Sequence, residues 1–144
     1  MDKGPVEILN ENIHAINLSL KRLLYSFENC CKIGLKDSFS EEEFESFEAM
    51  TSRYARTTDM LISKVLRGTI IDAVNNTEKR GIADAQDLRK LKDLRNSIAH
   101  EYVIENIVRF FDKVMEFTPL LKTVIENLTK YCTRYVEDIK EKIK

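Results

Sequence analysis

The chain has 144 residues and a formal net charge of −1, a length that suits one domain. It contains only 4 glycines and 2 prolines, whereas average usage of roughly 7% and 5% would give about 17 such residues. This scarcity argues against β-sandwiches and barrels, which need frequent turns. The glycines lie far apart, at 4, 34, 68 and 81, which excludes a glycine-rich phosphate loop.

Val6 opens the first apolar stripe, whose three-four spacing predicts a helix of about eight turns. The stripe consists of Val6, Leu9, Ile13, Ile16, Leu20, Leu23, Phe27 and Cys30. His14 lies off this stripe and is interpreted as a solvent-exposed surface residue. The pattern breaks between Gly34 and Phe39, where we expect a loop.

Ser40 and Glu43 predict a capping box at the start of a second helix. Its stripe is compatible with a continuation past Gly68 to Ile71, and it comprises Phe44, Phe47, Thr51, Tyr54, Thr58, Leu61 and Val65. Glutamates at 41, 42, 43, 45 and 48 give this start a local charge of −5. We interpret them as a capped, solvated helix start, which is favoured over a metal site.

Three further helices are expected after a polar loop at 75–81. Asp84 can cap a helix beginning near Ala85. Thr118 is expected to cap a last helix, with Pro119 in its first position. The three stripes are Leu88, Leu91, Arg95, Ile98 and Tyr102; Ile104, Ile107, Val108, Phe111, Val114 and Met115; and Leu121, Ile125, Leu128, Cys132, Tyr135 and Ile139. The prediction is one all-α domain over residues 1–144, an antiparallel bundle of about five helices.

Cys30, Cys31 and Cys132 are odd in number and two of them are adjacent, so a secreted disulfide framework is not expected. A reducing, cytoplasmic location fits these cysteines better. With two histidines, the chain lacks zinc-ligand spacing, and no metal or cofactor is expected. Neither a signal peptide nor a stretch of about 18 apolar residues is recognised, so no membrane association is expected.

Arg95 is the one residue that does not suit its place in an apolar stripe. At about 100° per residue, its stripe neighbours all lie within roughly 60° of it. A guanidinium there must be paired, solvated in a cleft or placed at an interface. Asn96 and His100 share a neighbouring face, and His100 lies about 140° around the helix from Arg95. The two side chains converge only if the helix ends near His100 or if two copies face each other.

This set of side chains suits cleavage of an RNA backbone. Arginine can hold a phosphate by two parallel hydrogen bonds, and histidine exchanges protons near neutral pH. A base would remove the proton of a ribose 2′-hydroxyl, whose oxygen attacks the adjacent phosphate while arginine stabilises the developing charge. One histidine per chain could supply both base and acid only if a dimer brings two together, or if water fills one role.

Residues 94–102, which read LRNSIAHEY, resemble the signature of the HEPN superfamily. Tyr102, two residues after His100, makes the stretch similar to the HepT toxin branch. The resemblance implies an all-helical, usually homodimeric, metal-independent ribonuclease of a toxin–antitoxin pair. Its partner would be a minimal nucleotidyltransferase antitoxin of the MntA type, which transfers AMP groups to the motif tyrosine.

Carried over by position, the resemblance makes Arg95 and His100 the catalytic pair, Asn96 a polar helper and Tyr102 the AMP acceptor. Family members often have glycine directly after the histidine, whereas this chain has Glu101. A carboxylate there could weaken RNA binding, raise the basicity of His100, or point away.

Basic residues on the same helix are candidate RNA contacts. Arg89, Lys90, Lys92 and Arg95 are opposed only by Asp93, which gives a local charge of +3. Such a rim could guide a phosphate backbone, although ordinary surface charge explains it equally well.

Two other functions are compatible with the motif. The chain could be a non-catalytic subunit that binds a nucleotide or substrate and forms a complex with a nucleotidyltransferase. It could also be a helical dimerisation module in which Arg95 is structural, a reading favoured if Arg95 pairs with a buried carboxylate of its own chain, closed off from solvent.

Overall fold

The computed structural model describes residues 4–34, 36–66, 81–101 and 107–143. The described residues form four α-helices and no strand: α1 (Pro5–Ile33), α2 (Glu41–Met60), α4 (Ala85–Glu101) and α5 (Ile107–Ile143). A π-helical turn, η1 (Leu61–Leu66), continues α2. The predicted all-α class is therefore confirmed for the described residues, which contain four α-helices where the sequence predicted a bundle of about five.

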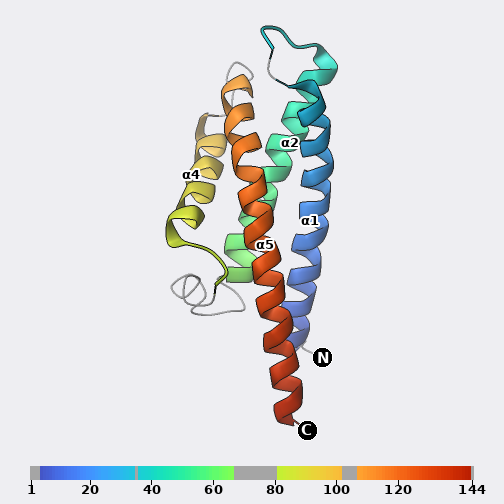
Figure 1. Cartoon of the computed structure of the whole chain (residues 1–144), viewed down its shortest axis with the longest axis vertical. Coiled ribbons are helices and arrows are strands. Elements are labelled where there is room, and N and C mark those ends of the chain that lie inside the picture. Colours follow the sequence, from blue (N-terminus) through green and yellow to red (C-terminus); the bar gives the residue numbers. More distant parts are fainter. Residues whose placement is uncertain (1–3, 35, 67–80, 102–106, 144) are drawn as a thin grey trace.

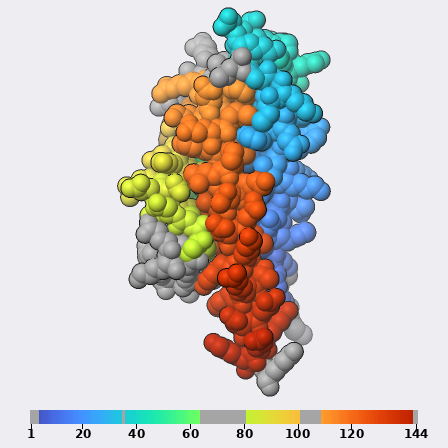
Figure 2. All heavy atoms as spheres, viewed as in Figure 1, coloured from blue at the N-terminus to red at the C-terminus, as the bar shows by residue number. Residues whose placement is uncertain are grey.

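Successive helices run in opposite directions, up, down, up and down in Figure 1. Helices α2 and α5 contact each other and form a central pair. Helix α1 packs on one flank of this pair and α4 on the other, and Figure 2 shows them at opposite edges of the molecule. The apolar stripes of all four helices meet between them in one hydrophobic core.

Helix α1 has the predicted stripe. All eight stripe residues are buried or half-buried, and His14 is exposed, as expected. The helix ends where Gly34 adopts φ +68°, a left-handed conformation that glycine adopts without a steric penalty. The Gly34 N–H donates to the carbonyl of Cys30 at 3.1 Å, so the predicted break is confirmed.

The capping box of α2 is also confirmed. The Glu43 N–H donates to the Ser40 hydroxyl at 3.2 Å, and the Ser40 N–H donates to the Glu43 carboxylate at 2.9 Å. Helix α2 ends at Met60, and the predicted continuation through 67–71 lies outside the described residues. Asp84 caps α4, as predicted, by accepting from the Gln86 N–H at 3.1 Å.

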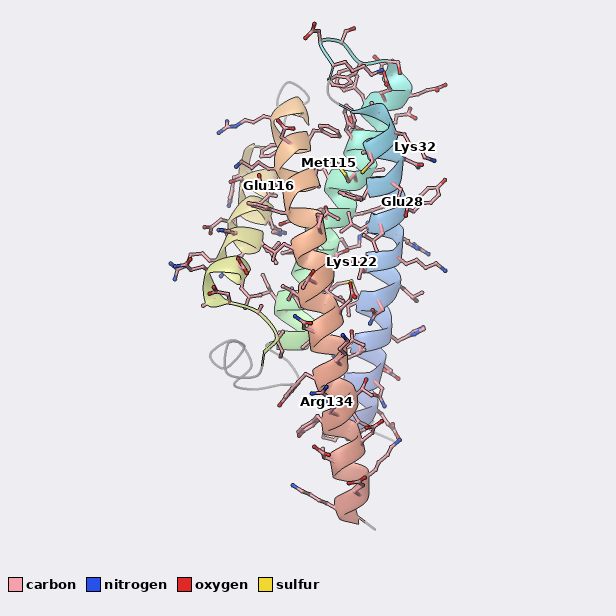
Figure 3. The ribbon with its side chains drawn as sticks, viewed as in Figure 1. Glu28, Lys32, Met115, Glu116, Lys122 and Arg134 are labelled. Carbon is pink, nitrogen blue, oxygen red and sulfur yellow. The ribbon has the colours of Figure 1, made fainter. Side chains whose placement is uncertain are left out.

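The prediction of a helix boundary at Thr118 and Pro119 is wrong, because α5 runs through both residues as one helix. In Figure 3 the ribbon is continuous between Glu116 and Lys122, on either side of the proline. An interior proline costs about 3 kcal/mol, since it lacks an N–H donor and its ring crowds the preceding turn. Here the Thr118 hydroxyl donates to the Val114 carbonyl at 2.6 Å. The apolar stripe is buried on both sides of this point, and that burial outweighs the local cost.

The prediction that Tyr135 is buried is also wrong. Tyr135 is 45% exposed, and its neighbour Val136 is buried in its place. The stripe steps by four residues from Leu128 to Cys132 and again to Val136, so it drifts around the helix and passes Tyr135 by.

All three cysteines are free thiols. Cys30 and Cys132 are buried, and burial raises the pKa of each to about 11, whereas Cys31 is exposed. In the part of the chain that the structure describes, no helix combines the length and the apolar character needed to cross a bilayer.

Candidate functional site

Helix α4 carries the motif and is the most lightly covered of the four helices. Three apolar residues, Leu91, Leu94 and Ile98, bury one side of it between α2 and α5. Most of its remaining circumference is exposed, including Arg89, Lys90, Lys92, Asp93, Asn96, Ala99 and His100. The motif therefore lies on an edge helix with a broad face open to solvent.

Arg95 is paired with Asp59, the penultimate residue of α2. Its Nε and Nη2 atoms donate to the two carboxylate oxygens, the second hydrogen bond measuring 2.8 Å. The Arg95 side chain is 30% exposed and that of Asp59 is 48% exposed, so the pair lies at the rim of the α2–α4 contact. The hydrogen bonds from Arg95 to Asp59 raise the pKa of the guanidinium above its usual value.

This pairing explains why an arginine occupies the edge of an apolar stripe. The buried centre of the stripe is formed by Leu91 and Ile98, and Arg95 and Leu94 lie on its two opposite edges. The half-buried guanidinium reaches past the core to Asp59. A purely structural arginine was expected to pair with a carboxylate of its own chain that is closed off from solvent. Asp59 belongs to the same chain but is open to solvent, so only the first condition is met.

Asp59 is the site residue that sequence reasoning missed. It lies 36 residues before Arg95, beside the stripe residue Thr58. One signal was available, since Asp59 is the only acidic residue between 49 and 71. A lone carboxylate beside an apolar stripe is a natural partner for a lone arginine in another stripe.

A second polar contact fixes α4 one turn before the motif arginine. The Tyr54 hydroxyl of α2 donates to the Leu91 carbonyl of α4 at 3.1 Å. Tyr54 is completely buried, and that burial raises the pKa of its phenol well above the usual range. Tyr54 and Asp59 thus hold α4 against α2 at two points, beside the buried Leu91 and at Arg95.

The structure does not bring Arg95 and His100 together within one chain. Helix α4 continues to Glu101, so the two side chains remain about 140° apart around its axis. Asn96 and His100 lie on the exposed face, and no hydrogen bond joins either to another described residue. Tyr102 and the side chain of Glu101 lie outside the described residues.

The predicted basic residues lie on two parts of the α4 surface. Lys90 lines a groove of about 510 Å³ between α4 and α5, whereas Arg89 and Lys92 are exposed outside that groove. Asp93 and Asp112 line the same groove, together with Arg109 and Lys113. Since Asp59 also pairs with Arg95, the surface around the motif has mixed charge and is less basic than residues 89–95 alone indicate.

No family model matches this chain, and the searches of curated proteins and of solved structures likewise found no match. Within the described residues, no three His, Cys, Asp or Glu side chains gather in positions to hold a metal ion. The functional argument therefore depends on the motif and on the geometry of α4.

Proposed function

We propose that the chain is a metal-independent endoribonuclease toxin of the HEPN type, restrained by a minimal nucleotidyltransferase antitoxin. One observation carries the proposal: a charged, oriented and partly exposed arginine lies on the same edge helix as an exposed histidine. The Asp59 carboxylate accepts hydrogen bonds from Nε and Nη2 of Arg95, and the N–H groups of Nη1 have no partner among the described residues. They are available to donate to a phosphate oxygen.

In the proposed reaction His100 removes the proton from a ribose 2′-hydroxyl. The 2′-oxygen attacks the adjacent phosphorus, and Arg95 stabilises the negative charge that builds on the phosphoryl oxygens. The bond to the 5′-oxygen breaks, and that oxygen takes a proton from an acid. The products are a 2′,3′-cyclic phosphate end and a 5′-hydroxyl end.

Two copies of the chain complete the site in this proposal. Arg95 and His100 diverge on one helix, but the exposed face of α4 allows Arg95 of one chain to approach His100 of another. The second His100 then supplies the acid. Asn96 orients the phosphate from the same face, and transfer of AMP to Tyr102 silences the enzyme by blocking the cleft with bulk and negative charge.

The first experiment compares three variants with the wild type. His100→Ala and Arg95→Ala are expected to abolish growth arrest and RNA cleavage when the chain is expressed alone. His14→Ala is the matched control, because His14 is the other histidine of the chain and lies exposed on α1. Cleavage by purified wild type should persist in excess EDTA and leave cyclic phosphate ends. Intact RNA and normal growth with the wild-type chain would contradict the proposal.

Asp59 favours a second candidate, a non-catalytic subunit that binds a nucleotidyltransferase. A carboxylate already bound to Arg95 competes with any phosphate for the guanidinium. Incubation with the nucleotidyltransferase and ATP, followed by mass spectrometry, separates the candidates. AMP addition that is lost in Tyr102→Phe and kept in Tyr135→Phe supports the toxin. A stable complex with neither AMP addition nor cleavage supports the binding subunit.

A further inference from the structure

Helix α1 carries a second, exposed stripe in addition to its core stripe. Ile8, Leu18 and Tyr25 are 41%, 49% and 65% exposed, and they are three of the four exposed large hydrophobic residues in the described part of the chain. They share one face with the half-buried Ala15. This face lies roughly 150° around the helix from the core stripe.

The spacing of this outer stripe is that of a coiled coil. Its positions alternate by three and four residues, as in the a and d positions of a heptad repeat. The outer stripe consists of Ile8, Glu11, Ala15, Leu18, Arg22 and Tyr25. Glu11 and Arg22 are both exposed.

Three polar contacts fix the rotation of α1 and so keep the outer stripe exposed. On the α2 side, the Ser19 and Thr57 hydroxyls are 2.7 Å apart, and the Arg53 guanidinium donates to the Ser26 hydroxyl at 2.7 Å. On the α5 side, the Asn17 amide donates to the Thr129 hydroxyl at 3.2 Å. Turning α1 to bury the outer stripe would break these hydrogen bonds and expose the core stripe.

We propose that the outer stripe binds the same stripe of a second copy, in antiparallel orientation about a twofold axis between residues 16 and 17. That register places Ile8 against the partner's Tyr25 and Ala15 against the partner's Leu18. It also places Glu11 against the partner's Arg22. One register thus pairs apolar with apolar side chains, a small with a large side chain, and an acid with a base.

A parallel pair is disfavoured by the same residues. In a parallel twofold arrangement each position meets its own copy, so Glu11 faces Glu11 and Arg22 faces Arg22. Like charges in direct contact oppose association. The antiparallel register converts both repulsions into attractive pairs, and symmetry makes each pair occur twice.

This contact is distinct from the proposed ribonuclease cleft. Helix α1 and α4 lie on opposite flanks of the central α2–α5 pair, so joining two α1 helices does not bring two copies of His100 together. The α1 contact and the α4 cleft can therefore be disrupted separately.

Sedimentation equilibrium over a concentration series tests the contact. Glu11→Arg and Arg22→Glu are each expected to raise the dissociation constant at least about tenfold, because symmetry places each change in the contact twice. The Glu11→Arg, Arg22→Glu double variant should recover association. Lys122→Glu and Glu126→Arg are matched charge reversals at exposed positions of α5, away from the outer stripe, and should leave association unchanged.

Leu18→Glu is a second disruptive variant. Because Leu18 is half-exposed in the single chain, the substitution should leave the chain folded, which circular dichroism would verify. A wild-type chain that stays monomeric would overturn the proposal, as would an association unaffected by Leu18→Glu. The proposal would also be overturned if the Glu11→Arg, Arg22→Glu double variant had a dissociation constant as high as those of the single variants. A monomeric wild type would also contradict the two-copy cleft at α4. The other two outcomes would overturn the α1 contact alone, because they leave the His100 variants unaffected.

Discussion

Helices α1 and α4 occupy equivalent flanks of the central α2–α5 pair, yet they are attached in different ways. Helix α1 has 29 residues and buries apolar side chains from Leu9 to Cys30, so a long hydrophobic seam holds it, supplemented by hydrogen bonds to α2 and α5. Helix α4 has 17 residues, buries its apolar side chains only from Leu91 to Ile98, and adds polar contacts to α2. The comparison shows that the helix with the candidate chemistry is also the one with the least hydrophobic attachment.

The largest expected difference between the flanks is in core truncation. Leu23→Ala on α1 removes a fully buried side chain, and we expect it to lower the free energy of unfolding by about 4 kcal/mol. Leu94→Ala on α4 lies at the edge of the core, where solvent can fill part of the gap, and should cost about 2 kcal/mol. Urea denaturation measures both values. Equal losses would contradict the view that α4 is the more lightly attached helix.

Removing the buried hydroxyl that fixes α4 should have a smaller effect. Tyr54→Phe deletes the hydrogen bond to the Leu91 carbonyl and is expected to lower the free energy of unfolding by about 1 kcal/mol. Tyr25→Phe, on the exposed face of α1, is the control and should change stability little. If the two variants lose the same stability, the Tyr54 contact does not help to attach α4.

The Arg95–Asp59 pair should contribute still less to stability. Both side chains are partly exposed, so solvent screens the pair, and Asp59→Asn is expected to cost about 0.5 kcal/mol. A double-mutant cycle with Arg95→Gln in urea denaturation isolates the interaction, which should weaken in high salt. A coupling of several kcal/mol would show instead that the pair is a structural element of the α2–α4 contact.

The smallest effect is expected at the corner between α1 and α2. Hydrogen bonds from Lys36 and from the Ser40 backbone lower the pKa of the partly exposed Glu43. Its stabilising contribution is therefore complete above the usual glutamate pKa of about 4.3 and is lost as the pH falls through the lowered value. The urea midpoint of Glu43→Ala, followed from neutral to acidic pH, should vary less than that of the wild type. Parallel curves would show that Glu43 does not contribute to this pH dependence.

The sequence was most informative where structure depends on neighbouring residues. The capping box at Ser40, the Asp84 cap and the end of α1 at Gly34 were all predicted correctly. Each depends on side chains and backbone groups within a few residues of one another. The same local reasoning failed at Pro119, because a proline favours a helix start locally and only burial of the stripe on both sides overrides it.

The candidate site likewise has features that follow from neighbouring residues and features that follow from the packing of distant elements. The sequence by itself determined that Arg95 and His100 lie on one helix at an angle, and that a guanidinium in an apolar stripe needs a partner. Only the tertiary structure decided that the partner is Asp59, 36 residues away, and that the outer stripe of α1 remains uncovered. Helical periodicity fixes angles within one element, whereas the partner of a charge and the exposure of a face depend on how separate elements pack.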